Sequence, residues 1–109
     1  MIHDNHLYGF DGAFLVCVNL DDGKRCWKER GYGAGQALLL YDQGVLLLLT
    51  EEDGDVALVA AQPSGLNELA RIPALEGKTW NHPVIAHGRL YVRNAEQIAC
   101  YELKLAAAP

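Results

Sequence analysis

The stretch Leu7-Tyr-Gly-Phe-Asp-Gly-Ala-Phe-Leu-Val-Cys-Val-Asn-Leu20 decides the fold, because a second copy of it occurs near the end of the chain. The second copy is Leu90-Tyr-Val-Arg-Asn-Ala-Glu-Gln-Ile-Ala-Cys-Tyr-Glu-Leu103. Leu, Tyr, Cys and Leu recur without a gap, 83 positions apart. A looser copy over residues 45–61 lies midway. The chain is therefore built from repeats of about 41 to 42 residues.

Short apolar runs alternate with Gly-containing turn signals such as Asp11-Gly12, Asp21-Asp22-Gly23 and Asp42-Gln43-Gly44. This pattern is typical of antiparallel strands joined by tight turns. A single buried helix over 37–49 is the alternative for the most apolar segment, but Asp42-Gln43-Gly44 interrupts it. We expect strands near 6–10, 13–20, 24–30, 36–41, 45–50, 55–61, 66–72, 83–86, 89–93 and 97–103.

Several of these strands are apolar at consecutive positions rather than alternate ones, as in Val45-Leu-Leu-Leu-Leu49. Such strands are covered on both faces of their sheet. A repeat in the forties with several short strands is typical of a β-propeller, whose blades stack face to face. The sequence therefore predicts an all-β protein, a partial β-propeller of about two and a half four-stranded antiparallel blades.

The repeat also predicts the domain organisation. Residues 1–34 are expected to form a partial blade of the outer three strands, 35–76 a complete blade, and 77–105 a partial final blade of the inner three strands. Residues 106–109 are expected to be a tail. Because a ring needs roughly four to eight blades, we expect a C-terminal fragment of a longer protein. Its partners would be the remaining blades, or further copies that self-associate through open edges.

Charge and hydropathy exclude some classes of function. The chain has 9 Lys and Arg against 14 Asp and Glu, a net charge of −5, and no basic run. Nucleic-acid binding is therefore not expected. No apolar stretch approaches the roughly 20 residues of a transmembrane helix, and the first residues do not resemble a secretory signal. The three cysteines are interpreted as structural thiols.

The segment Cys17-Val-Asn-Leu-Asp-Asp-Gly-Lys-Arg-Cys-Trp27 resembles the Ala-x-Asp-x-x-Thr-Gly-Lys-x-x-Trp repeat of the PQQ-like (quinoprotein alcohol dehydrogenase-like) β-propellers. Gly23, Lys24 and Trp27 match, whereas positions 17, 19 and 22 carry other residues. Residues 77–93 look like the family's entry into a new blade. The resemblance implies that Gly23 forms the turn and that Trp27 docks between neighbouring blades.

The resemblance suggests two functions. The first is a non-catalytic scaffold without bound quinone that takes a protein partner, at a periplasmic or other extracytoplasmic location as in the family's outer-membrane assembly lipoprotein. The alternative is the C-terminal part of a PQQ-dependent alcohol or sugar dehydrogenase, in which the complete ring holds PQQ and calcium. The adjacent cysteine pair expected of such an enzyme does not occur in this chain.

Two groups of residues are candidates for ligand binding. Trp80, Asn81 and His82 precede the innermost strand of the last blade, near the central funnel where propellers bind ligands. They could stack on and hydrogen-bond a planar ligand, or they could serve packing and loop hydrogen bonds. Arg89 and Arg93 lie on one face of one strand and could bind an anion. A solvated polar row is the alternative.

Three other motifs are interpreted as structural. His3 and His6 have a spacing that metals can use, but nothing completes a ligand set, so no metal site is predicted. Gly31-Tyr-Gly-Ala-Gly35 superficially resembles a phosphate-binding loop but precedes a hairpin, and we expect a connection between blades. The acidic turn over residues 51–55 is expected to be solvated, with no justified calcium spacing. No catalytic residues are predicted.

Overall fold

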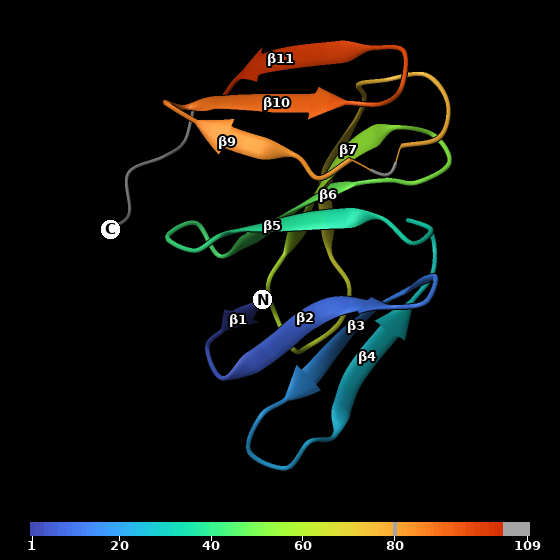
Figure 1. The fold of residues 1–109 in the computed structure, drawn as a ribbon. Helices are drawn as coiled ribbons and strands as arrows, with labels where there is room; N and C mark the ends of the chain where they lie inside the picture. The colour runs from blue at the N-terminus through green and yellow to red at the C-terminus, as the bar shows by residue number, and fades with distance from the viewer. Residues whose placement is uncertain (80, 104–109) are drawn as a thin grey trace.

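The computed structural model describes residues 1–79 and 81–103 (Figure 1). These residues form eleven strands and no helix. The strands are β1 (Ile2–His3), β2 (His6–Asp11), β3 (Phe14–Asn19), β4 (Arg25–Glu29), β5 (Gln36–Leu40), β6 (Val45–Leu49), β7 (Asp55–Ala60), β8 (Glu68–Pro73), β9 (Val84–Ala86), β10 (Arg89–Arg93) and β11 (Ile98–Glu102). The all-β prediction is confirmed, and each of the ten predicted strands is present with bounds within two residues of those expected.

The strands pair into three antiparallel sheets in simple chain order. The first sheet is β1-β2-β3-β4, the second is β5-β6-β7-β8, and the third is β9-β10-β11. Tight turns at the predicted glycines join neighbouring strands. Gly12 and Gly44, for example, have φ angles of 60° and 63°, a left-handed conformation that side chains other than glycine's adopt at a cost. Each sheet is therefore a meander built from local hairpins.

The first sheet has four strands rather than the three expected for residues 1–34. The additional strand, β1, pairs Ile2 with Leu7 and His3 with His6. The amino group of Met1 also donates a hydrogen bond to the carbonyl of Tyr8, at 3.0 Å. A two-residue strand is too short to show a periodic pattern, which is why the sequence did not reveal it. The tail predicted at 106–109 lies outside the described residues.

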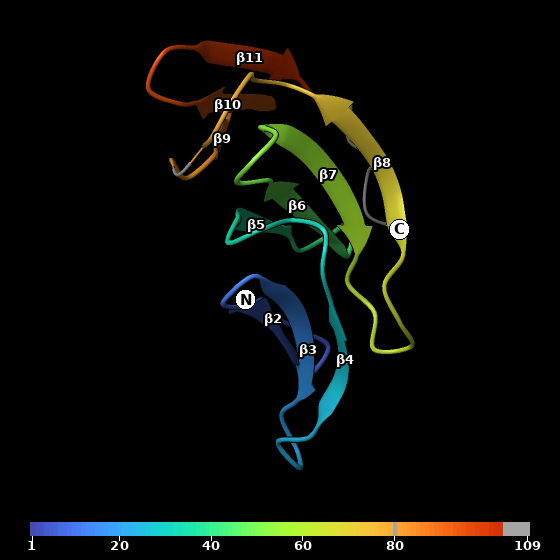
Figure 2. The same ribbon diagram turned by 90° about the vertical axis from the view of Figure 1, so that its right-hand side faces the viewer.

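The three sheets are stacked face to face, with the second sheet in the middle (Figure 1). Seen from the side, β2, β5 and β9 lie toward one side of the molecule, and β4 and β8 lie toward the other (Figure 2). In the first two sheets the earlier strands therefore lie toward one side of the molecule and the last strands toward the other. No helix among the described residues is long and apolar enough to cross a membrane.

Strand β6 lies at the centre of the hydrophobic core. Its side chains alternate between the two faces of the second sheet. Leu46 and Leu48 belong to a cluster shared with the first sheet, whereas Leu47 and Leu49 belong to a cluster shared with the third sheet. All four are 0% exposed. The expectation that this consecutive apolar run is covered on both faces is therefore confirmed.

The repeat in sequence is also a repeat in strand pairing. In the first sheet, Tyr8 lies opposite Cys17 and Leu7 opposite Val18. In the third sheet, the residues 83 positions later pair in the same way, with Tyr91 opposite Cys100 and Leu90 opposite Tyr101. The β2–β3 and β10–β11 hairpins are thus equivalent, position by position.

Candidate functional sites

Trp27 lies between the first and second sheets. Its indole packs in the shared hydrophobic cluster, 8% exposed, with its ring centroid 6.2 Å from that of Tyr8. The indole N–H donates a 2.8 Å hydrogen bond to the carbonyl of Gln62, which follows β7. One side chain thus supplies both apolar contact and a polar anchor across the interface. Gly23 forms the β3–β4 turn, with φ 69° and its N–H donating to the carbonyl of Asn19 at 2.9 Å.

The first predicted ligand group lies in the connection between β8 and β9. Trp80 lies outside the described residues. Asn81 is half-buried and His82 is exposed. The Nδ1 atom of His82 lies 2.7 Å from the carbonyl oxygen of Pro83, within hydrogen-bond distance. The imidazole of His82 therefore contacts a backbone carbonyl of its own loop. Loop hydrogen bonding was the alternative to ligand binding for these residues.

The two predicted arginines lie at opposite ends of β10. Arg89 and Arg93 are both exposed, and their side chains leave the strand on the face opposite to buried Leu90 and Val92. Four residues of strand separate them by about 13 Å along the backbone. Within the described residues, no ion pair holds either guanidinium. The two arginines therefore form a spaced, exposed polar row, and their guanidinium groups are not placed together to bind one anion.

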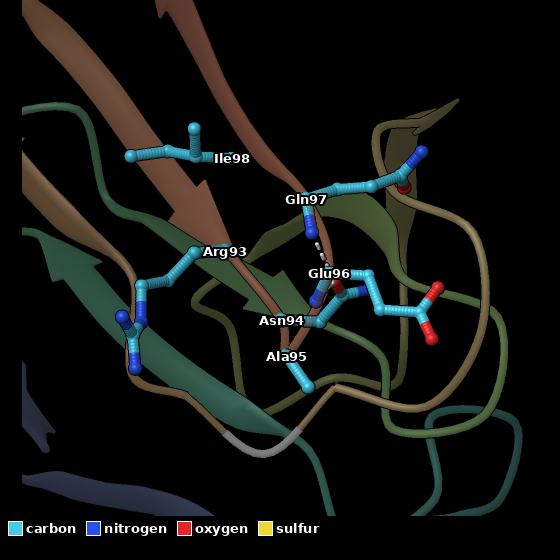
Figure 3. Close-up of a pocket in the computed structure, with 6 residues that line it drawn as sticks. All are labelled: Arg93, Asn94, Ala95, Glu96, Gln97 and Ile98. Atoms are coloured by element: carbon cyan, nitrogen blue, oxygen red, sulfur yellow. Dashed lines mark hydrogen bonds between the residues drawn. The ribbon is translucent and has the colours of Figure 1, made fainter.

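An open hollow of about 270 Å³ lies beside Arg93, at the turn between β10 and β11 (Figure 3). The amide of Asn94 holds this turn. Its oxygen accepts from the backbone N–H groups of Glu96 and Gln97, at 3.0 and 2.8 Å, and its nitrogen donates to the carbonyl of Glu76 at 2.7 Å. Figure 3 shows the Arg93 side chain pointing away from those of Glu96 and Gln97. The polar groups of Asn94 thus support the turn itself.

A polar network that the sequence did not predict links the connection after β4 to the outer strand β8. The hydroxyl of Tyr32 donates to Glu68 Oε1 at 3.0 Å, and Arg71 donates to the same oxygen at 2.7 and 3.1 Å. Arg71 also reaches Asp55 at 3.5 Å, and its guanidinium lies over the Tyr32 ring, 5.1 Å from the centroid. The network joins three segments distant in sequence.

The network changes the ionisation of its members. Hydrogen bonds from Arg71 lower the pKa of Glu68, because they stabilise the carboxylate. Burial and the contact with Glu68 raise the pKa of Tyr32 to about 12. At neutral pH the network is therefore a carboxylate held between a guanidinium and a neutral phenol. These contacts stabilise the fold. Tyr32, in the glycine-rich segment, lies in the connection between β4 and β5, as expected for a connection between sheets.

The remaining candidate motifs take structural positions. His6 Nδ1 lies 2.7 Å from the carbonyl of Asp4, and the His3 ring meets Tyr41 edge-on, with centroids 5.2 Å apart. Within 1–79 and 81–103, no group of three or more His, Cys, Asp or Glu is arranged to hold a metal ion. In the acidic turn, Glu52 lies 3.8 Å from Lys78, and Asp55 contacts Arg71, so two of the carboxylates expected to be solvated are in ion pairs.

The cysteines differ in their surroundings. Cys17 is buried in the cluster between the first two sheets, and burial raises the pKa of its thiol to about 11. It is therefore protonated and unreactive at neutral pH. Cys26 and Cys100 are exposed free thiols.

The fold and these contacts define an all-β protein of three stacked antiparallel sheets whose conspicuous aromatic and polar side chains tie sheets and turns together. No known protein-family model matches the chain, and a search of curated proteins finds no significant relative.

Proposed function

We propose that this chain is a non-catalytic structural module of the β-propeller type, whose stacked sheets serve as a scaffold for protein contacts. The observation that carries the proposal is the division of the β6 side chains. Leu46 and Leu48 pack toward one neighbouring sheet and Leu47 and Leu49 toward the other, all fully buried. A sheet that is apolar on both faces is a stacking unit, as a propeller blade is.

Three further observations support a radial array. Strands β2, β5 and β9 of the three sheets lie toward one side of the molecule (Figure 2). The pairing of Tyr8 with Cys17 is repeated by Tyr91 with Cys100, which is expected of copies of one unit. Trp27 docks between consecutive sheets, as its place in the PQQ-like repeat motif implies. Because a closed ring needs roughly four to eight sheets, a complete propeller requires more sheets than this chain contains.

The contacts of the polar side chains favour a scaffold over an enzyme. The amide of Asn94 and the indole N–H of Trp27 bond backbone groups, and Glu68 bonds Arg71 and Tyr32. Each of these contacts joins two segments of the chain rather than presenting a group to a ligand. The same resemblance to PQQ-like propellers carries the expectation of an extracytoplasmic location and a protein partner.

The rival function is part of a quinone-dependent dehydrogenase, and one experiment separates the two. The complete ring to which the chain is proposed to belong is incubated with PQQ and calcium chloride, desalted, and examined for quinone absorbance and for dye-linked oxidation of ethanol and glucose. A known PQQ dehydrogenase serves as the positive control. We expect the ring to retain no quinone and to reduce no dye.

A stoichiometric quinone spectrum with alcohol or sugar oxidation would contradict the scaffold proposal. A matched variant, His82→Ala, then tests the predicted ligand group, because loss of the bound quinone would assign it to the connection before β9. The outcome does not depend on how copies of the chain associate.

A further inference from the structure

The outward face of the third sheet carries counterparts of residues that are buried inside the molecule. Leu15 in the first sheet is 0% exposed and packs against the second sheet, whereas Ile98, 83 positions later, is 74% exposed. Tyr8 and Cys17 are likewise buried at 1% and 0%. Their counterparts Tyr91 and Cys100 pair on the same strands in the same register, but no sheet covers them. The third sheet thus has a stacking face without its neighbour.

The first sheet shows the reverse. Leu90 in the third sheet is 1% exposed and packs against the second sheet, whereas its counterpart Leu7 is 39% exposed on the outward face of the first sheet. Leu7 lies beside Ile2, which is 56% exposed, and opposite Val18. Val16, two positions from Val18, faces the same way. This outer face thus has an apolar strip on β1, β2 and β3, next to which Lys28 lies opposite Val16 and Arg25 lies opposite Val18 on β4.

We infer that a second copy of this chain docks head-to-tail, with the outward face of its first sheet stacked on the outward face of the third sheet. The contact would repeat, between two molecules, the stacking seen between the first and second sheets within one. This inference rests on the proposed stacking function and names its partner.

The repeat is the argument for a second copy rather than an unrelated partner. Each uncovered face occupies the same strand positions as a face that this same chain covers with one of its own sheets. Tyr91 and Cys100 match Tyr8 and Cys17, whereas Arg93 stands where the covered face has Phe10. The two uncovered faces differ from each other. The outward face of the first sheet is therefore expected to pair with the outward face of the third sheet of another copy, and not with the same face of that copy. Such a heterologous contact produces rings if the rotation closes and open arrays if it does not.

The uncovered faces also have a composition suited to association. Four apolar side chains, Ile2, Leu7, Val16 and Val18, lie on the first, with Arg25 and Lys28 at its β4 edge. Tyr91 and Ile98 lie on the second. On the third sheet Arg89 and Arg93 flank Tyr91 along β10, which gives the apolar centre a charged border. Exposed apolar patches bordered by polar side chains are typical of protein–protein contacts.

The test uses one substitution on each face, Leu7→Asp and Ile98→Asp, in the full chain. Leu69→Asp is the matched control, because Leu69 is 53% exposed on β8 but belongs to neither outward face. Masses are measured by sedimentation velocity and light scattering over a range of concentrations, with circular dichroism as the check of folding. Both test positions are exposed in the single chain, so the variants are expected to fold.

We expect the wild type and Leu69→Asp to exceed the 11.9 kDa chain mass increasingly with concentration. Each single-face variant should remain a monomer. An equimolar mixture of Leu7→Asp and Ile98→Asp should form a dimer of twice the chain mass and nothing larger, because each variant keeps the face that the other lacks. No third molecule should add to this dimer, because each of its two free faces carries an aspartate whose charge would be buried by the contact.

A wild type that is monomeric throughout would overturn the inference, and so would a mixture that stays monomeric. If only one of the two variants were monomeric and the other formed dimers, the contact would be symmetric and the head-to-tail arrangement wrong. Neither result bears on the quinone assay or on packing within one molecule, so the proposed function is judged separately.

Discussion

Trp27 shows how a single residue connects the repeat to the fold. Its position four residues after Gly23 is a feature of the motif, and its ring and N–H together bridge the first sheet and the segment after β7. Large buried aromatic side chains contribute strongly to packing, because they bury a large apolar surface. Trp27 is therefore where a small change should have the largest effect on stacking of the first two sheets.

We expect Trp27→Ala to lower the free energy of unfolding by about 3 to 5 kcal/mol, through the lost ring and the cavity it leaves. Trp27→Phe keeps a ring but leaves the carbonyl of Gln62 without its donor, at a cost of about 1 to 3 kcal/mol. Urea unfolding monitored by circular dichroism measures both. A loss below about 1 kcal/mol for Trp27→Ala would show that the ring does not carry the interface.

Residue positions were predictable from the sequence where spacing within one repeat decides them. Gly23 and Trp27 lie on a local motif, so both could be placed in advance. The partners of Tyr32 could not, because Glu68 lies 36 positions away and no pattern in the sequence joins them. The predicted arginine pair was chemically suggestive, but extended backbone separates the two side chains.

At the scale of the element, β8 is the outer strand of the second sheet and is exposed along its whole length. Because its side chains bury little apolar surface, polar contacts contribute more to holding β8 in the sheet. Arg71 joins Glu68 of the same strand to Asp55 at the start of β7, and Tyr32 joins Glu68 from the connection after β4. The network thus joins the exposed strand β8 to β7 of the same sheet and to the connection between β4 and β5.

We expect Glu68→Gln to destabilise the protein at neutral pH by about 1 kcal/mol, a value reduced because the Glu68 side chain is 33% exposed. The pKa of Glu68 is lowered in the folded protein, so its ionised form stabilises the fold above about pH 5, and this contribution is lost as the pH falls through the folded pKa. The difference between wild type and variant should therefore disappear in acid.

Urea unfolding of both proteins across the acid range measures this pH dependence. Glu96→Gln is a control, because Glu96 lies in the exposed β10–β11 turn outside the network. Equal stabilities of the wild type and Glu68→Gln at neutral pH would show that the network contributes nothing.

Strands were the most predictable level of this structure. Glycine turns and runs of β-favouring residues recur at every hairpin, so local signals agree along the chain. The exception is β1, whose two residues are held by pairing with β2 and by the Met1 amino group rather than by a pattern of their own. Short strands that depend on their neighbours leave no periodic signal.

At the scale of the whole molecule, the three sheets form two interfaces of the same kind. The first holds Tyr8, Leu15, Cys17 and Trp27 against the second sheet, and the second holds Leu90 and Val92 against it. The consecutive leucines of β6 indicated this arrangement in the sequence.

The central claim is that β6 divides its side chains between two neighbouring sheets. Nuclear Overhauser contacts of the leucine methyl groups in the labelled protein test it most directly. The account predicts that, of the two neighbouring sheets, Leu46 and Leu48 contact the first sheet only and Leu47 and Leu49 contact the third sheet only. Contacts of all four leucines with one and the same sheet would contradict it.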